Sequence, residues 1–169
     1  HAHGAVVGLA GHVDHAVAQV QRDRHFRVEL AKARHQRRHV PPPEARRRLG
    51  LPDRPTVGYV GRHSAYKGID TLLEAAPLVW ADHPEVTILV AGSALGWSGH
   101  RDAREAGLGE GRLVVVEDFA SEDRADLLAA CDVVAFPSRE ESFGMATIEA
   151  WAARRPVVAA DIAVTREII

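Results

Sequence analysis

The chain has 169 residues, of which 46% are hydrophobic, and its formal net charge is −2 at pH 7. A chain of this length buries roughly two-thirds of its unfolded surface on folding, so no disulfide or metal is needed to stabilise a core. Its single cysteine, Cys131, excludes an internal disulfide and a cysteine-based zinc site. One cysteine also favours a reducing compartment, and we expect a cytoplasmic protein. No apolar run approaches the ~18 residues of a transmembrane helix.

Charge and histidine are unevenly distributed along the chain. Seven of the ten histidines lie in residues 1–39, and residues 1–48 hold ten Lys/Arg against four Asp/Glu. We therefore divide the chain into residues 1–43, an irregular His/Arg-rich segment ending in a stiff proline linker, and residues 44–169, a folded domain. Residues 44–49 are expected to form a short helical turn with Gly50 as its C-cap.

Three interpretations of the His/Arg-rich segment are open. Its basic residues could contact nucleic acid or an acidic membrane, but they lack interleaved aromatic residues and a regular face, so we expect no nucleic-acid partner. The spacing of some histidine pairs suits a metal ion, although no acidic or cysteine partner accompanies them. These pairs are His1/His3, His12/His15 and His35/His39. We favour the third interpretation, that about residues 1–40 are out-of-frame or otherwise non-native. A sequence rich in His, Arg, Ala and Gly with no periodic pattern is typical of GC-rich coding DNA translated in the wrong reading frame.

From residue 56 onward the apolar pattern is regular. Continuous apolar runs bounded by glycine or proline predict strands at 56–60, 86–91, 113–116, 133–136 and 156–160. Helical spacing predicts helices at 69–80, 127–130, 143–153 and from 165, with Pro77 kinking or restarting the first. This alternation predicts an α/β fold with a doubly wound parallel sheet. Ligands bind such sheets beyond the carboxyl ends of the strands, so the loops there are the candidate site.

The loop after the first predicted strand is suited to a diphosphate. Arg62 and Lys67 stand five positions apart, are bracketed by Gly61 and Gly68, and precede a helix. Glycine lets backbone approach a ligand, a helix N-terminus attracts anions, and both cations bind phosphate oxygens. The Lys-Gly order excludes a Walker loop. Taken alone, the loop fits a surface turn with two solvated cations equally well.

The loop after the fourth predicted strand places carboxylates beside a helix N-terminus. Ser142 is expected to be the N-cap of that helix. Glu141 and Glu149 stand eight positions apart, so they can bracket a hydroxyl-rich guest, since a carboxylate accepts from two vicinal hydroxyls. By spacing alone a capped amphipathic helix with a solvated Glu149 is the simpler interpretation. Together, the two loops match a nucleotide-sugar, which has a diphosphate, a ribose diol and a polyhydroxylated ring.

Three segments, VGYVGRHSAYKGIDTLLEAAPLV, ILVAG and LLAACDVVAFPSREESFGMATIEAWAARRPVVAADI, resemble retaining glycosyltransferases of family 4 (group 1). The resemblance covers about residues 56–169 and implies the C-terminal half of a GT-B fold, a Rossmann-like domain that binds the nucleotide-sugar donor. It implies metal-independent catalysis, with no metal ligands and no cofactor beside the donor substrate.

The resemblance also implies a role for each matching residue. Arg62 and Lys67 would hold the donor diphosphate and stabilise the leaving group, and Glu141 would contact the transferred sugar. Glu149 would accept from the ribose hydroxyls. Further donor-binding positions are Gly61, Gly92, Ser142, Phe143, Gly144 and Met145, and residues 117–119 would lie near the base.

The chain departs from the family pattern in three respects. Asp118 stands about where the family has glycine, which affects base recognition, and Arg155 replaces the glycine before Pro-Val-Val. The acceptor-binding N-terminal domain and the last crossing helix have no counterpart in the sequence. We therefore expect a fragment that binds donor but transfers no sugar alone.

The acceptor, a glycan, lipid or small molecule, is not specified, and any peripheral membrane association would come through the absent domain. The rival hypotheses are a noncatalytic nucleotide-binding or interaction module, a degenerate gene product, and a GT-B sugar-nucleotide epimerase.

Overall fold

The computed structural model describes residues 40–93, 98–105 and 107–169. The His/Arg-rich segment up to residue 39, with its histidine pairs and basic run, lies outside the described residues. The structure therefore does not test our three interpretations of it. Among the residues that the structure describes, no helix is long and apolar enough to cross a membrane.

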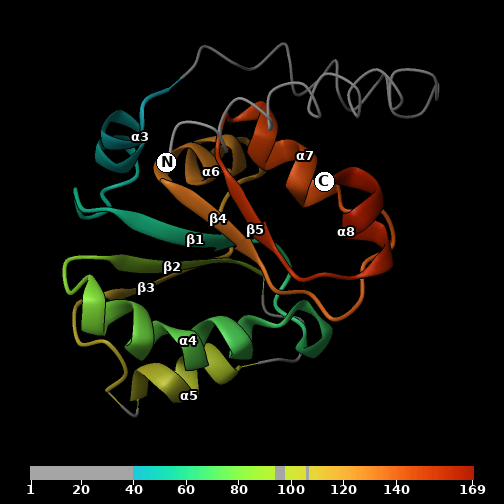
Figure 1. Ribbon diagram of the computed structural model, residues 1–169. Helices are drawn as coiled ribbons and strands as arrows, with labels where there is room; N and C mark the ends of the chain where they lie inside the picture. The colour runs from blue at the N-terminus through green and yellow to red at the C-terminus, as the bar shows by residue number, and fades with distance from the viewer. Residues whose placement is uncertain (1–39, 94–97, 106) are drawn as a thin grey trace.

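One five-stranded parallel sheet organises the described chain (Figure 1). Its strands are β1 (Thr56–Val60), β2 (Thr87–Gly92), β3 (Leu113–Glu117), β4 (Val133–Phe136) and β5 (Val157–Ala159). They lie in the order β3-β2-β1-β4-β5, so the chain moves outward from β1 to one edge and then returns to build the other. This order confirms the predicted Rossmann-like sheet. It also makes the boundary between β1 and β4 the topological switch point, where the strand order reverses.

Helices cover both faces of the sheet. They are α3 (Pro42–Arg48), α4 (Ile69–Asp82), α5 (Gly99–Glu105), α6 (Arg124–Ala130), α7 (Met145–Ala152) and α8 (Ala163–Ile168), with 3-10 turns η1 (Ala65–Lys67) and η2 (Ser121–Asp123). Figure 1 shows α4 and α5 on one face and α3, α6 and α7 on the other. Every residue of β2 is buried, as expected for a strand covered on both sides.

The core lies between the central strands and the flanking helices. Ile88, Leu89 and Val90 of β2 are fully buried, and Leu127 and Leu128 of α6 close the other side. These five side chains belong to one contiguous apolar cluster, and burying each contributes roughly 1.5–3 kcal/mol. The core therefore fixes the sheet whose carboxyl edge carries the candidate loops.

Several predicted elements need correction. The proline linker is wrong beyond Pro41, because Pro42 and Pro43 open α3, where the missing N–H groups of proline cost no intrahelical bond. The C-cap of α3 is Leu49, and Gly50 follows it with φ +65°. Pro77 neither kinks α4 into two elements nor restarts it, since one helix runs from Ile69 to Asp82.

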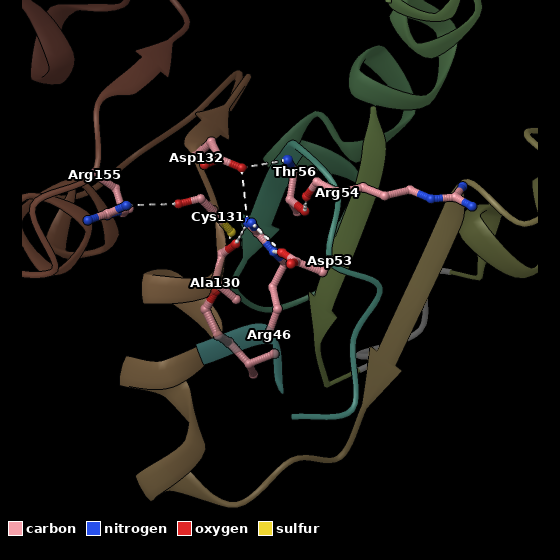
Figure 2. A network of polar contacts seen from close by, with 9 residues as sticks. Arg46, Asp53, Arg54, Thr56, Ala130, Cys131, Asp132 and Arg155 are labelled. Carbon is pink, nitrogen blue, oxygen red and sulfur yellow. Dashed lines mark hydrogen bonds and ion pairs between the residues drawn. The ribbon is translucent and has the colours of Figure 1, made fainter. Parts of the chain in front are cut away.

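A buried arginine fastens α3 to the sheet (Figure 2). Arg46 is 5% exposed. Its Nη1 donates to the Ala130 carbonyl and to Asp132 Oδ2, both at 3.0 Å, while Nε and Nη2 reach Asp53 Oδ1. Asp132 Oδ2 also accepts from the Thr56 amide at 2.8 Å. One guanidinium thus joins α3, the entry to β1 and the turn between α6 and β4.

Candidate functional site

The loops after β1 and β4 meet at the carboxyl edge of the sheet. β1 and β4 are hydrogen-bonded neighbours, so both loops leave the sheet side by side. Gly68, which ends η1, has φ +68°, and a Cβ there would collide with the carbonyl of Pro137 at the end of β4. Only glycine combines this left-handed backbone with so close an approach. The two loops are therefore packed backbone to backbone.

Arg139, in the loop after β4, forms hydrogen bonds with the loop after β1. Its amide donates to the Tyr66 carbonyl at 2.8 Å, and its Nη1 donates to the Ala65 carbonyl at 2.8 Å. The guanidinium also forms a two-pronged ion pair with Asp70 in the first turn of α4, at 2.9 and 2.8 Å. This hydrogen bonding with Arg139 lowers the pKa of Asp70. Arg139 thus orders the loop that carries Arg62 and Lys67.

Lys67 and Glu141 form an ion pair across the junction. Their side chains are 16% and 14% exposed, so the pair is mostly withdrawn from solvent. The ammonium of Lys67 also lies 5.2 Å from the centre of the Tyr66 ring. Two residues that the sequence analysis assigned to diphosphate and sugar are therefore in direct contact.

Glu149 is fixed by a cation that the sequence analysis missed. Arg124, the first residue of α6, places Nε and Nη2 at 2.8 and 2.7 Å from Glu149 Oε2. Its Nη2 also lies 3.4 Å from the Val60 carbonyl at the end of β1. Glu149 is therefore held at the carboxyl edge of the sheet and is not a solvated helix residue.

The start of α7 differs from the expectation. Gly144, with φ +74°, is the N-cap, and α7 begins at Met145, so Ser142 is not the cap. The left-handed glycine turns the chain into the helix without a side-chain cap, and Ser142 is exposed. The amides of the first turn of α7 still point out of the helix, as a phosphate site requires. Phe143 lies just before them with 45% of its surface exposed.

Arg62 projects from the first loop into solvent. Its carbonyl accepts a 2.7 Å hydrogen bond from the Tyr59 hydroxyl, and burial, followed by the nearby Glu141 charge, raises the pKa of Tyr59. Gly61 donates its amide to the Ala91 carbonyl at 2.9 Å, which continues the β1–β2 pairing. A Cβ on Gly92 would collide with the Gly61 carbonyl, so these glycines allow the two strand ends to close together.

The segment after β3 adopts the backbone that glycine would favour. Asp118 has φ +53°, a left-handed conformation that aspartate tolerates better than most residues. Beside it, Glu117 contacts His100 at 3.1 Å and Arg101 at 2.9 and 2.8 Å, and hydrogen bonding from Arg101 lowers the pKa of Glu117.

Arg155, which replaces the family's glycine before Pro-Val-Val, does not have a positive φ. It is 9% exposed and donates Nε to the Ala153 carbonyl at 2.9 Å.

The family model "Glycosyl transferases group 1" matches residues 54–169, more than half of the chain. The chain belongs to the group 1 glycosyltransferase family. The described part is a GT-B C-terminal domain, with the α/β sheet that the sequence predicted.

Curated relatives match about 70% of this chain. A D-inositol 3-phosphate glycosyltransferase of Stackebrandtia nassauensis is 37% identical over 130 residues, which cover 70% of this chain and 29% of the relative. A protein of the same description from Mycobacterium sp. (strain KMS) is 41% identical over 126 residues, 70% of this chain and 27% of the relative. The chain therefore spans less than a third of the length of these relatives.

Solved structures share its fold. The C-terminal domain of the group 1 protein LpcC from Francisella tularensis superposes with a TM-score of 0.66 at 26% identity, covering 78% of this chain and 72% of that domain. HepE of Anabaena, solved in complex with UDP and glucose, gives a TM-score of 0.62 at 31% identity, covering 76% of this chain and 35% of HepE.

Proposed function

We propose that this group 1 domain binds a nucleoside-diphosphate sugar and presents it for retaining glycosyl transfer. The observation that carries the proposal is the convergence of Arg62, Lys67, Glu141 and the N-terminus of α7 on one edge of the sheet. Because β1 and β4 are hydrogen-bonded neighbours, the loops that carry these phosphate-binding and hydroxyl-binding groups leave the sheet side by side. Support comes from HepE, which was solved with UDP-glucose in a related fold.

The diphosphate would lie against the first loop and the start of α7. Arg62 offers a planar fork to phosphate oxygens, and the α7 amides offer partial positive charge. Lys67 has three N–H donors, so it can keep Glu141 and still donate to a phosphate oxygen. As the glycosidic bond breaks, negative charge grows on the diphosphate, and these donors stabilise it without rearrangement.

The two glutamates would accept from hydroxyl groups. Glu141, which Lys67 contacts, would accept from the transferred sugar, and Glu149, which Arg124 contacts, would accept from the ribose. An ionised carboxylate offers about four lone-pair sites, so both glutamates retain acceptor capacity beyond their arginine or lysine contacts. The ion pairs would fix the carboxylates in place before the donor arrives.

The transfer step also needs an acceptor-binding site, which the family resemblance assigns to a separate N-terminal domain. We propose that the chain alone binds donor without transferring sugar. Turnover of UDP-glucose to a glycosylated product by the purified chain would overturn this part.

Calorimetric titration with UDP tests the binding proposal. The double variant Arg62→Ala/Lys67→Ala should weaken UDP binding by at least about tenfold, since charge-assisted hydrogen bonds contribute roughly 1.5–3 kcal/mol each. The matched control is Arg47→Ala/Arg54→Ala, which removes the same charge from two exposed arginines outside the loops at the carboxyl edge. Equal losses in both variants would show nonspecific attraction, and no binding by the wild type would favour the noncatalytic interaction module.

A further inference from the structure

Two buried histidines and a glutamate form a second cluster at the same edge of the sheet. His63 lies in the loop after β1, His100 in α5 and Glu117 at the end of β3. Both histidine side chains are fully buried, and their ring centres lie 4.6 Å apart. His100 Nε2 is 3.1 Å from Glu117 Oε1. One ligand atom from each of the three residues lies within 4.8 Å of the other two.

We propose that His63, His100 and Glu117 bind a divalent transition-metal ion, and that zinc fits them best. Two imidazoles and one carboxylate form a common three-residue zinc ligand set, with a fourth position left for water. The cluster uses none of the residues assigned to the diphosphate or the sugars, although Glu117 belongs to the segment 117–119 that the resemblance places near the base.

The geometry requires only a small contraction. Zinc bonds of 2.0–2.2 Å in a tetrahedral arrangement place ligand atoms roughly 3.3–3.5 Å apart. The His100–Glu117 pair, at 3.1 Å, is already close to that spacing. The remaining spacings, all within 4.8 Å, close by about 1 Å or slightly more. A Cβ on Gly92 would lie 3.0 Å from His63 Nε2, so the absence of a side chain there leaves space beside the ring.

The protonation state of His63 and the accessibility of Glu117 suit a metal ion. Burial, followed by the neighbouring His100, lowers the pKa of His63 to about 4, so its ring is neutral near pH 7 and can act as a ligand. Glu117 supplies the negative charge and is 26% exposed on its side chain, which gives the ion a route from solvent. Arg101 contacts both carboxylate oxygens of Glu117, so it can stay on Oε2 while Oε1 turns to the metal.

A metal at this position would join three segments that are distant in the sequence. His63 directly follows Arg62, and Glu117 directly precedes Asp118 at the proposed base-binding segment. The bound ion would therefore order both segments without taking part in phosphate binding. This role differs from metal-dependent catalysis, in which the ion contacts the diphosphate itself.

Zinc titration of the full chain, followed by calorimetry, tests the site. Residues 1–39 hold seven histidines, so zinc binding by the whole chain is not sufficient evidence. The decisive quantity is one binding event that disappears in Glu117→Gln and in His100→Gln. Each variant should lose more than about 100-fold in affinity for that event, because even outer partners of metal ligands contribute 10–100-fold. The matched controls, Glu85→Gln and His83→Gln, change exposed residues outside the cluster and should bind as the wild type does.

Hydrogen exchange of the wild type gives a second readout that does not depend on variant folding. Zinc should slow amide exchange in residues 59–64 and 113–118, and magnesium at the same concentration should not. Equal zinc binding by all four variants, or no slowing in these segments, would overturn the proposal. Neither measurement uses a nucleotide, so this outcome is separate from the outcome of the UDP titration.

Discussion

Lys67 and Glu141, 74 positions apart in the sequence, form an ion pair that joins the loop after β1 to the loop after β4. In the proposed donor complex, the pair would lie where the diphosphate meets the sugar. Glu141 would then have two opposing effects on the donor: it would order Lys67, and it would repel the nearby diphosphate.

Glu141→Gln separates these two effects. The amide keeps a hydrogen-bond acceptor for Lys67 but removes the negative charge, so we expect UDP to bind about 3–10-fold more tightly, as removal of one nearby like charge predicts. The measurement is calorimetric titration with UDP. The control is Glu140→Gln in the exposed neighbouring residue, which should change the affinity much less. Weaker UDP binding by Glu141→Gln would show that Glu141 acts mainly by ordering Lys67.

Gly68→Ala should destabilise the domain by more than about 2 kcal/mol. A left-handed residue with a Cβ costs roughly 1–2 kcal/mol, and the collision with the Pro137 carbonyl adds to it. Gly50→Ala is the matched control, because Gly50 also has a positive φ (+65°) but nothing within 4 Å of its Cβ position. Urea denaturation of both variants measures the difference. Equal losses would mean that the loop contact adds nothing beyond backbone strain.

Arg46→Met should cost about 2–4 kcal/mol in the free energy of unfolding. The methionine fills much of the volume, but the Ala130 carbonyl, Asp132 and Asp53 lose their shared donor. Arg47→Met, on the exposed side of the same helix, should change stability by less than about 0.5 kcal/mol. Chemical denaturation checks both. A loss below 1 kcal/mol for Arg46→Met would show that α3 is held by apolar packing alone.

Cys131 should be inert in the folded protein. It is fully buried, and burial raises the pKa of its thiol to about 12, so almost no thiolate exists at pH 8. We expect reaction with a thiol reagent only at the rate of opening of the domain, and rapid reaction in urea. The time course of labelling at both conditions measures this. Fast stoichiometric labelling of the native chain would contradict the buried position of the thiol.

The Asp70–Arg139 pair should make a small, pH-dependent contribution to stability. Arg139 lowers the pKa of Asp70 below its ordinary value of 3.8, so the folded state favours the ionised carboxylate. The contribution is therefore present above pH 4 and is lost as the pH falls through the lowered value. Asp70→Asn should lower the midpoint of thermal unfolding at pH 7, and its difference from the wild type should shrink as the pH falls below 4. A decrease that stays constant with falling pH would assign the effect to packing.

The sequence predicted the sheet well because its strands are continuous apolar runs bounded by glycine or proline. It gave no sign of α5, because residues 99–105 are polar and have no apolar period. It also placed the start of α7 at Ser142, where serine chemistry favoured a cap, although Gly144 makes the turn. The preference of serine for the N-cap position did not decide the start of α7, because the left-handed backbone of Gly144 turns the chain directly into the helix.

The loop motifs identified two residues that the structure brings into contact, but they did not reveal the arginines that hold the loops and Glu149 in place. Lys67 and Glu141 were found from the loop motifs, and the structure brings them together. Arg124 and Arg139 were missed, because a single arginine at a helix start or inside a loop has no distinguishing spacing. Their partners, Glu149 and Asp70, lie 25 and 69 positions away, so only the fold reveals them.

The contact between Gly68 and Pro137 has a consequence for how this domain can change. The loops after β1 and β4 are packed backbone to backbone and joined by hydrogen bonds from Arg139, so we expect a change in one loop to disturb the other. Substitutions in one loop will therefore show epistasis with substitutions in the other. Libraries meant to alter donor preference should vary residues 61–68 and 137–144 together, since improvements found in either loop alone will seldom add.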